Sequence, residues 1–180
     1  MTQDDLRTIH QIEDATQGSQ PIPSSIVRGW MSCTSIEVQG ELSIFLLKHS
    51  ERIEPPLSME EIFSAVHKYY RQCLIQNVQD SDYAPNRSIA GLELVRWFKY
   101  LWRDSTVPRE YLIRLKTMLR DLYIENKVPQ DQMVGAVLEH LFETLEIQEF
   151  FADWKSDPRL ARGFALAKEW GDGHLNNPSF

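Results

Sequence analysis

Three carboxylates and a histidine between residues 139 and 146 form the group of side chains best suited to chemistry. Glu139, Glu143 and Glu146 are spaced four and three residues apart, so a continuous helix would place them on one face. Together with His140 they have donor atoms for a divalent metal ion or for proton transfer. The opposite, buried face of this helix is marked by Leu138, Leu141 and Leu145. We therefore expect the carboxylates to face water, and we predict no metal.

The other candidate catalytic groups lack a local context. The chain contains no G-x-S-x-G, P-loop, H-E-x-x-H or C-x-x-C sequence. Cys73 and His67 share a predicted helix, but six residues at about 100° each turn them about 240° apart. We expect the cysteine in the core. The enzymatic alternative is a site assembled from separate helices, in which His140 and Glu139 meet His67 or Cys33. No cofactor is predicted.

Basic and aromatic side chains gather in the segment before the acidic one. Arg96, Lys99 and Arg103 fall on one face of a predicted helix and are interleaved with Trp97 and Tyr100, a mixture that single-stranded nucleic acids can use. The net charge of −7 and the pI near 5.2 disfavour nucleic acids and anionic membranes. Pairing with neighbouring acids is the preferred interpretation, and a regulatory nucleic-acid-binding module is an alternative.

The charge is distributed unevenly along the chain. Residues 92–127 include eight basic and five acidic residues, whereas residues 128–154 include six acidic residues and no lysine or arginine. We interpret the second segment as an uncompensated acidic helix that faces a partner with a basic surface. Two aromatic runs, at 97–102 and 150–154, hold more rings than one buried stripe needs. We expect most of them in the core and the remainder as exposed anchors for binding.

Apolar residues recur at spacings of three and four almost throughout, which predicts helices and no sustained strand. The clearest helix start is a capping box at Ser58 and Glu61. The expected helices cover about residues 4–17, 25–30, 35–50, 58–77, 88–102, 108–122, 129–154 with a bend, and 158–170. The pattern therefore predicts an all-α compact bundle of seven or eight helices, with irregular or HEAT-like pairing in the C-terminal half.

The 180 residues, of which 42% are hydrophobic, predict a single domain. Within it we expect N-terminal helices at 1–57, the main core at 58–170 and an irregular tail at 171–180, where Gly171 ends the last helix. Two cysteines predict reduced thiols, with a single bridge as the alternative. The N-terminus resembles no signal peptide and no apolar run is long enough to span a membrane, so we expect a cytoplasmic protein.

The longest predicted loop, residues 79–88, is rich in turn-forming residues. Loops that rigid helices hold in place are common binding sites. Tyr83, Asn86 and Arg87 in this loop therefore form a second candidate patch for a partner.

Several segments resemble a loosely defined group of small, uncharacterised bacterial all-helical proteins. The segments are Arg87-Ser88 with Trp97-Phe98, Leu138-Glu139-His140-Leu141-Phe142-Glu143, and Phe151-Ala152-Asp153-Trp154 through Glu169-Trp170-Gly171. Some proteins of this kind resemble immunity partners of toxins. The resemblance implies a bacterial cytosolic helical protein that neutralises a toxin, and it carries over no catalytic residue.

These observations together predict a non-enzymatic protein–protein interaction module of the immunity type. It would neutralise a toxin or effector through an acidic and aromatic face. The expected contact residues are Glu139, Glu143, Glu146, Tyr83, Asn86 and Arg87. Because complementary charge mainly speeds association and sets specificity, reversal of the three glutamates to lysine is expected to abolish binding.

Overall fold

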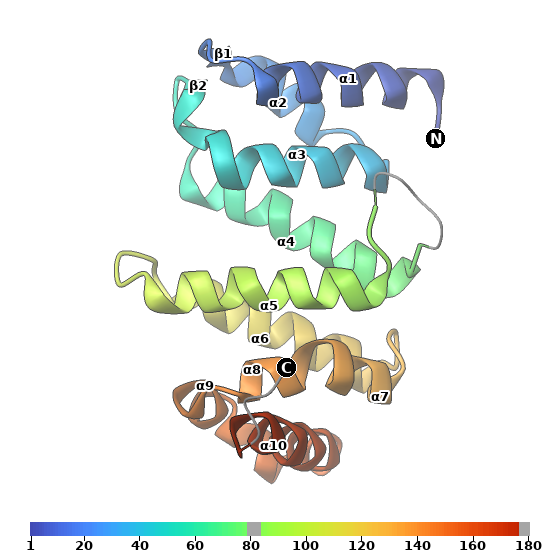
Figure 1. Ribbon diagram of the computed structural model, residues 1–180, viewed down its shortest axis with the longest axis vertical. Coiled ribbons are helices and arrows are strands. Elements are labelled where there is room, and N and C mark those ends of the chain that lie inside the picture. Colours follow the sequence, from blue (N-terminus) through green and yellow to red (C-terminus); the bar gives the residue numbers. More distant parts are fainter. Residues whose placement is uncertain (79–83, 177–180) are drawn as a thin grey trace. The chain divides into compact units, whose positions relative to one another are not determined.

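The structure is a computed structural model that describes residues 1–78 and 84–176. The all-α prediction is confirmed, because the described elements are helices apart from one pair of two-residue strands. They form two compact units, residues 1–85 and 86–180, coloured blue to green and green to red in Figure 1. The division falls near residue 85, not at residue 57 where the sequence suggested the end of an N-terminal group.

The first unit is built on three long helices and a short one. Its elements are α1 (Gln3–Gln17), β1 (Ile22–Pro23), α2 (Ser24–Met31), α3 (Ile36–His49), η1 (Ser50–Arg52), β2 (Ile53–Glu54) and α4 (Met59–Gln76). Helix α3 packs against both α1 and α4, and β1 pairs with β2 in parallel, with Ile22 opposite Ile53. The buried side chains between them include Ile9, Ile12, Val27, Phe45 and Leu46.

Capping chemistry fixes the start of α4 as predicted. The Ser58 hydroxyl accepts a hydrogen bond from the Glu61 amide at 3.2 Å, and the Glu61 carboxylate accepts one from the Ser58 amide at 2.9 Å. Arg28 in α2 also donates to Glu61, with Nε 2.8 Å from Oε1. The bonds from Arg28 and then from Ser58 lower the pKa of Glu61 to about 2.

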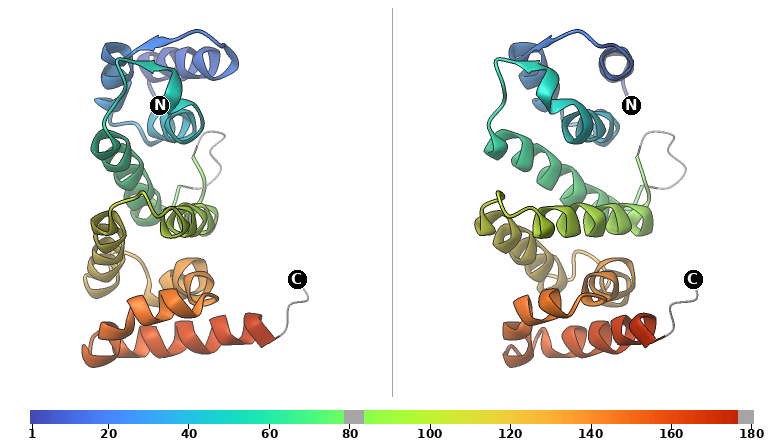
Figure 2. Two further views of the ribbon diagram at one scale, coloured as in Figure 1. Left: turned by 90° about the vertical axis from the view of Figure 1, so that its left-hand side faces the viewer. Right: turned by 60° about the vertical axis from the view of Figure 1, so that its left-hand side comes forward.

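The second unit has three long helices, α5, α6 and α10, and shorter pieces between α6 and α10. Its elements are α5 (Arg87–Arg103), α6 (Arg109–Ile124), α7 (Gln130–Met133), η2 (Val134–Leu138), α8 (Glu139–Phe142), α9 (Leu145–Phe150), η3 (Ala152–Ser156) and α10 (Ala161–Asn176). Helix α10 runs alongside the η2–α8 segment, and α5 packs on η2 (Figure 2). Most of the predicted aromatic runs are core, including Trp97, Phe98, Phe151 and Trp154.

The segment 129–154, which was expected to be one helix with a bend, consists of several pieces. Residues 134–138 form a π-helical turn, η2, and the helix then ends at Phe142. Thr144 is extended, with φ −118° and ψ 115°, and α9 starts after it. Glu143 is therefore the C-cap residue of α8, whereas Glu146 lies on the next helix, α9.

The predicted stop at Gly171 is also wrong, because α10 continues to Asn176. Gly171 instead marks a close approach between helices. A Cβ atom at this position would lie 2.9 Å from the Glu139 carbonyl oxygen, a distance that side chains do not tolerate. The glycine therefore lets α10 pack directly on the backbone of α8.

Within residues 1–78 and 84–176, none of the helices combines the length and the apolarity that crossing a membrane requires.

Candidate functional site

The three glutamates do not form one outward acidic face. Glu139 is turned inward, with a side chain only 15% exposed. Glu143 is half-buried at the end of α8, and Glu146 is exposed on α9. Leu145, which was expected on the buried side, is 60% exposed. The predicted face is wrong because it assumed a continuous helix, and the break at Thr144 rotates the later residues away.

Glu139 and Glu143 enclose His140. The Nδ1 atom of His140 lies 3.0 Å from Glu143 Oε1, and its Nε2 atom lies 3.3 Å from Glu139 Oε1. Lys99 on α5 donates to the other oxygen of Glu143 at 2.9 Å. Burial raises the pKa of Glu143, but the hydrogen bonds from Lys99 and His140 more than offset this and lower it.

The acidic segment is therefore partly compensated inside its own unit, where Lys99 pairs with Glu143. Lys116 on α6 donates in the same way to Asp153 and to the Phe150 carbonyl oxygen. Residues 86–180 hold 14 acidic and 13 basic residues, whereas residues 1–85 hold 12 acidic and 6 basic ones. Nearly all of the net negative charge thus belongs to the first unit. The interpretation of residues 128–154 as an uncompensated acidic helix is therefore wrong for Glu143 and Asp153, which pair with lysines of α5 and α6.

The second predicted patch is largely used for structure. Asn86 caps α5, with its side-chain oxygen accepting from the Ile89 amide at 3.1 Å. Arg87 is only 9% exposed and donates to Gln132 at the end of α7. Burial lowers the pKa of Arg87. Tyr83 lies outside the described residues.

A pocket of about 350 Å³ lies between the start of α5 and the π-helical turn. Ser88, Leu92, Gln132, Gly135, Ala136 and His140 line it. It lies beside both predicted patches, since His140 is held by Glu139 and Glu143, and Gln132 is held by Arg87. π-Helical turns occur frequently at functional sites, and this one supplies the floor of the pocket.

The residues that the structure describes form no catalytic constellation around His140. Both ring nitrogens of His140 already lie against carboxylate oxygens, so this imidazole is not poised as a base for Ser88. The other members of the enzymatic alternative are in the first unit, where His67 stacks on Phe63 at 5.6 Å. Neither cysteine forms a disulfide within the described residues, and Cys73 is buried. Among the described residues, no group of three His, Cys, Asp or Glu side chains is placed to hold a metal ion.

The outward stripe of α5 was not recognised as a candidate protein-binding surface from the sequence. Ile89, Leu92 and Tyr100 are 49%, 38% and 63% exposed. Together with the exposed Arg96 and Arg103 they lie within about 80° of arc around the helix axis. We refer to these five residues as the α5 face. Their spacing could have revealed the stripe, but apolar residues at helical spacing normally indicate a buried face.

The two arginines of the α5 face keep their charge available. Neither Arg96 nor Arg103 forms an ion pair with any residue that the structure describes. Lys99, the third basic residue of the predicted nucleic-acid face, is instead engaged by Glu143. Burial raises the pKa of the neighbouring Glu93, and the charge of Arg96 opposes this shift. The α5 face is thus apolar, aromatic and cationic.

The fold and the surface define an all-α protein with a candidate docking face in its second unit. No protein-family model, curated protein or solved structure matches the chain. The resemblance to small bacterial helical proteins therefore stays a prediction.

Proposed function

We propose that this protein is a non-enzymatic protein–protein interaction module that binds its partner through the α5 face. The exposed stripe carries the proposal, because Ile89, Leu92 and Tyr100 present apolar surface along one side of a 17-residue helix. Tyrosine and arginine are over-represented among residues that dominate binding energy. The pocket beside Leu92 adds a depression into which one partner side chain can insert.

The charge of the α5 face indicates the chemistry of the partner. Arg96 and Arg103 are seven residues apart, which is two helical turns or about 10.5 Å. An amphipathic helix whose apolar side covers Leu92 and Tyr100 would complement them if it carried two carboxylates at the same separation. The partner is therefore an acidic amphipathic helix. The resemblance noted from the sequence favours a toxin or effector as its carrier.

The proposal differs from the acidic face that the sequence predicted. Glu139 and Glu143 hold His140 and Lys99, so reversing them to lysine would disrupt the second unit itself. Only Glu146 of the three is exposed. Loss of binding in the triple variant would consequently not distinguish a contact from a folding defect.

A photo-crosslinking residue at position 92 would first identify the partner in cells. Its affinity for the purified full-length chain would then be measured by surface plasmon resonance for wild type, Arg96→Glu/Arg103→Glu and Tyr100→Ala. We expect losses of more than about 100-fold for the double variant and about 10-fold or more for Tyr100→Ala. Lys127→Glu, an exposed charge change outside the α5 face, should leave the affinity unchanged.

The protein-binding proposal is wrong if the double variant and wild type bind the crosslinked partner equally. It is also wrong if the chain binds short single-stranded or duplex oligonucleotides at low salt and loses this binding in the same double variant. That outcome would support the nucleic-acid alternative.

A further inference from the structure

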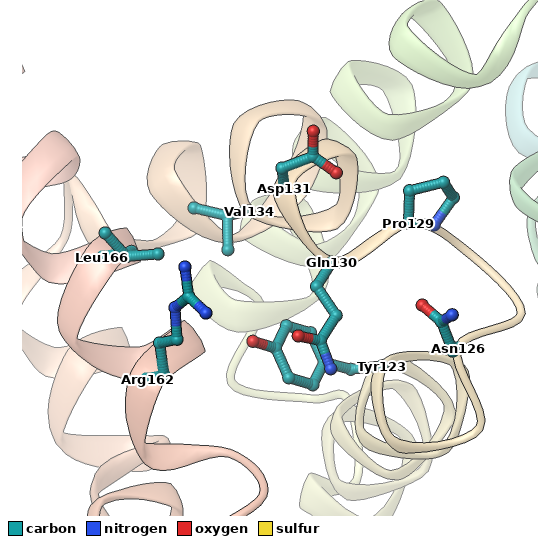
Figure 3. Close-up of a pocket in the computed structure, with 8 residues that line it drawn as sticks. All are labelled: Tyr123, Asn126, Pro129, Gln130, Asp131, Val134, Arg162 and Leu166. Carbon is teal, nitrogen blue, oxygen red and sulfur yellow. The ribbon is translucent and has the colours of Figure 1, made fainter.

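A second and larger pocket, of about 610 Å³, lies in the second unit between the end of α6, the start of α7 and α10. Figure 3 shows the side chains that line it. Its volume is within the range of small-molecule binding sites. It shares no lining residue with the pocket beside Leu92, and it is separate from the α5 face.

A tyrosine hydroxyl lines this pocket without a hydrogen-bond partner among the described residues. Tyr123 is only 1% exposed, and its hydroxyl forms no hydrogen bond with any other residue described in the structure. Trp154 holds the ring in place at a centroid distance of 6.4 Å, as does the backbone of Gly163. Figure 3 shows the hydroxyl directed toward Arg162. A phenolic hydroxyl can donate one hydrogen bond, so Tyr123 can donate to a ligand in the pocket that accepts one.

Arg162 supplies a positive charge to the same pocket. It forms no ion pair within the described part of the chain. Burial raises the pKa of Tyr123, and the charge of Arg162 partly opposes the shift, so the phenol remains a neutral donor close to a permanent cation. A guanidinium beside a hydroxyl donor suits a carboxylate.

The other residues that line the pocket indicate the size, polarity and charge of the ligand. Val134 and Leu166 provide an apolar wall, while the amides of Asn126 and Gln130 add further donors. Asp131 also lines the pocket, and its negative charge disfavours a dianion such as phosphate. We propose that the pocket binds a small monocarboxylate with an apolar body, held by Tyr123 and Arg162.

Isothermal titration of the full chain with acetate, 3-methylbutanoate and phenylacetate would test the site, with the corresponding neutral amides as matched ligands. We expect millimolar binding of 3-methylbutanoate and phenylacetate, at least 10-fold weaker binding of their amides, and no tighter binding of inorganic phosphate. Arg162→Gln should weaken phenylacetate binding at least 10-fold, and Tyr123→Phe about 5- to 10-fold. Asp131→Asn should strengthen it a few-fold.

Arg159→Gln is the matched control, because Arg159 pairs with Asp157 at 2.8 Å and does not line the pocket. This variant should bind phenylacetate as wild type does. The proposal fails if no carboxylate of the series binds at 10 mM, if acids and amides bind equally, or if Arg162→Gln and Tyr123→Phe leave the affinity unchanged. These titrations contain no protein partner, so their outcome is independent of the proposal for the α5 face.

Discussion

At Gly91, α5 approaches the π-helical turn closely, and replacement of this glycine by alanine tests that packing. A Cβ atom at position 91 would lie 2.6 Å from the carbonyl oxygen of Ala136 and 2.9 Å from its Cβ. Helix propensity alone favours alanine over glycine by about 1 kcal/mol. Overpacking against a backbone atom costs about 1–3 kcal/mol. Since the backbone cannot rotate away as a side chain can, the overpacking cost should lie in the upper part of this range, at about 2–3 kcal/mol. After the gain in helix propensity is subtracted, we expect Gly91→Ala to destabilise the second unit by about 1–2 kcal/mol.

Urea unfolding followed by tryptophan fluorescence would measure the change, because Trp97 and Trp154 are buried in the second unit. Gly29→Ala in α2 is the control, since a Cβ atom there would meet no atom within 4 Å. It should stabilise the protein by up to about 1 kcal/mol. Equal stabilisation by both substitutions would show that α5 and η2 are not in contact at Gly91, and would remove the physical basis for the pocket beside Leu92.

Three further predictions concern carboxylates, measured as the difference in unfolding free energy between variant and wild type across pH. Glu61→Gln should be destabilising at pH 7, because Arg28 lowers the folded-state pKa of Glu61 to about 2, and the difference should vanish as the pH falls from about 4.5 to 2. Glu41→Gln should be stabilising at pH 7, because burial and then repulsion by Glu13 raise the pKa of Glu41; the gain should disappear below pH 4.5. Glu143→Gln should cost about 1 kcal/mol at pH 7, because its lysine and histidine partners lower its pKa despite burial, and less in acid. A pH-independent difference in any of the three would contradict the assigned cause.

Local chemistry explains why most helix boundaries could be predicted from the sequence. The capping box at Ser58 and Glu61 involves residues three apart, and the boundary of α1 at Gln17 follows from Gly18 in the same way. The burial of Trp97 and Trp154 also agrees with the expectation for the aromatic runs. Each of these features depends on neighbours within one or two turns, which is the range over which a sequence pattern is informative.

The break after Phe142 depends on contacts that a local pattern does not contain. The side chain of Gln148 is buried, and its Nε2 atom donates to the Phe142 carbonyl oxygen at 2.6 Å and to Asp172 on α10 at 3.0 Å. It thereby satisfies a carbonyl that a continuing helix would have bonded. Neither the spacing of leucines nor the helix propensity of the segment indicates such a contact.

The candidate site was misjudged for the same reason. Lys99 meets Glu143 and Lys116 meets Asp153 across 44 and 37 residues of chain. Counting charges along the sequence separates these partners into a basic and an acidic segment, although they neutralise each other in the fold. The α5 face emerges only after these internal pairs are removed from the list of available charges, because Arg96 and Arg103 then remain.

The charge distribution of the chain predicts how the affinity for a partner depends on salt. This dependence distinguishes a protein partner from a nucleic acid. The chain carries a net charge of −7, most of it in residues 1–85, so an acidic partner helix is repelled at long range and attracted by Arg96 and Arg103 at short range. Salt screens both effects. We therefore expect the affinity for a protein partner to change less than about threefold between 0.05 and 0.5 M salt. Duplex DNA held by two arginines would lose about 60-fold over that tenfold range, since log affinity falls by about 0.9 per phosphate contact. If the affinity for the crosslinked partner fell about 60-fold between 0.05 and 0.5 M salt, this result would contradict the protein-binding role of the α5 face.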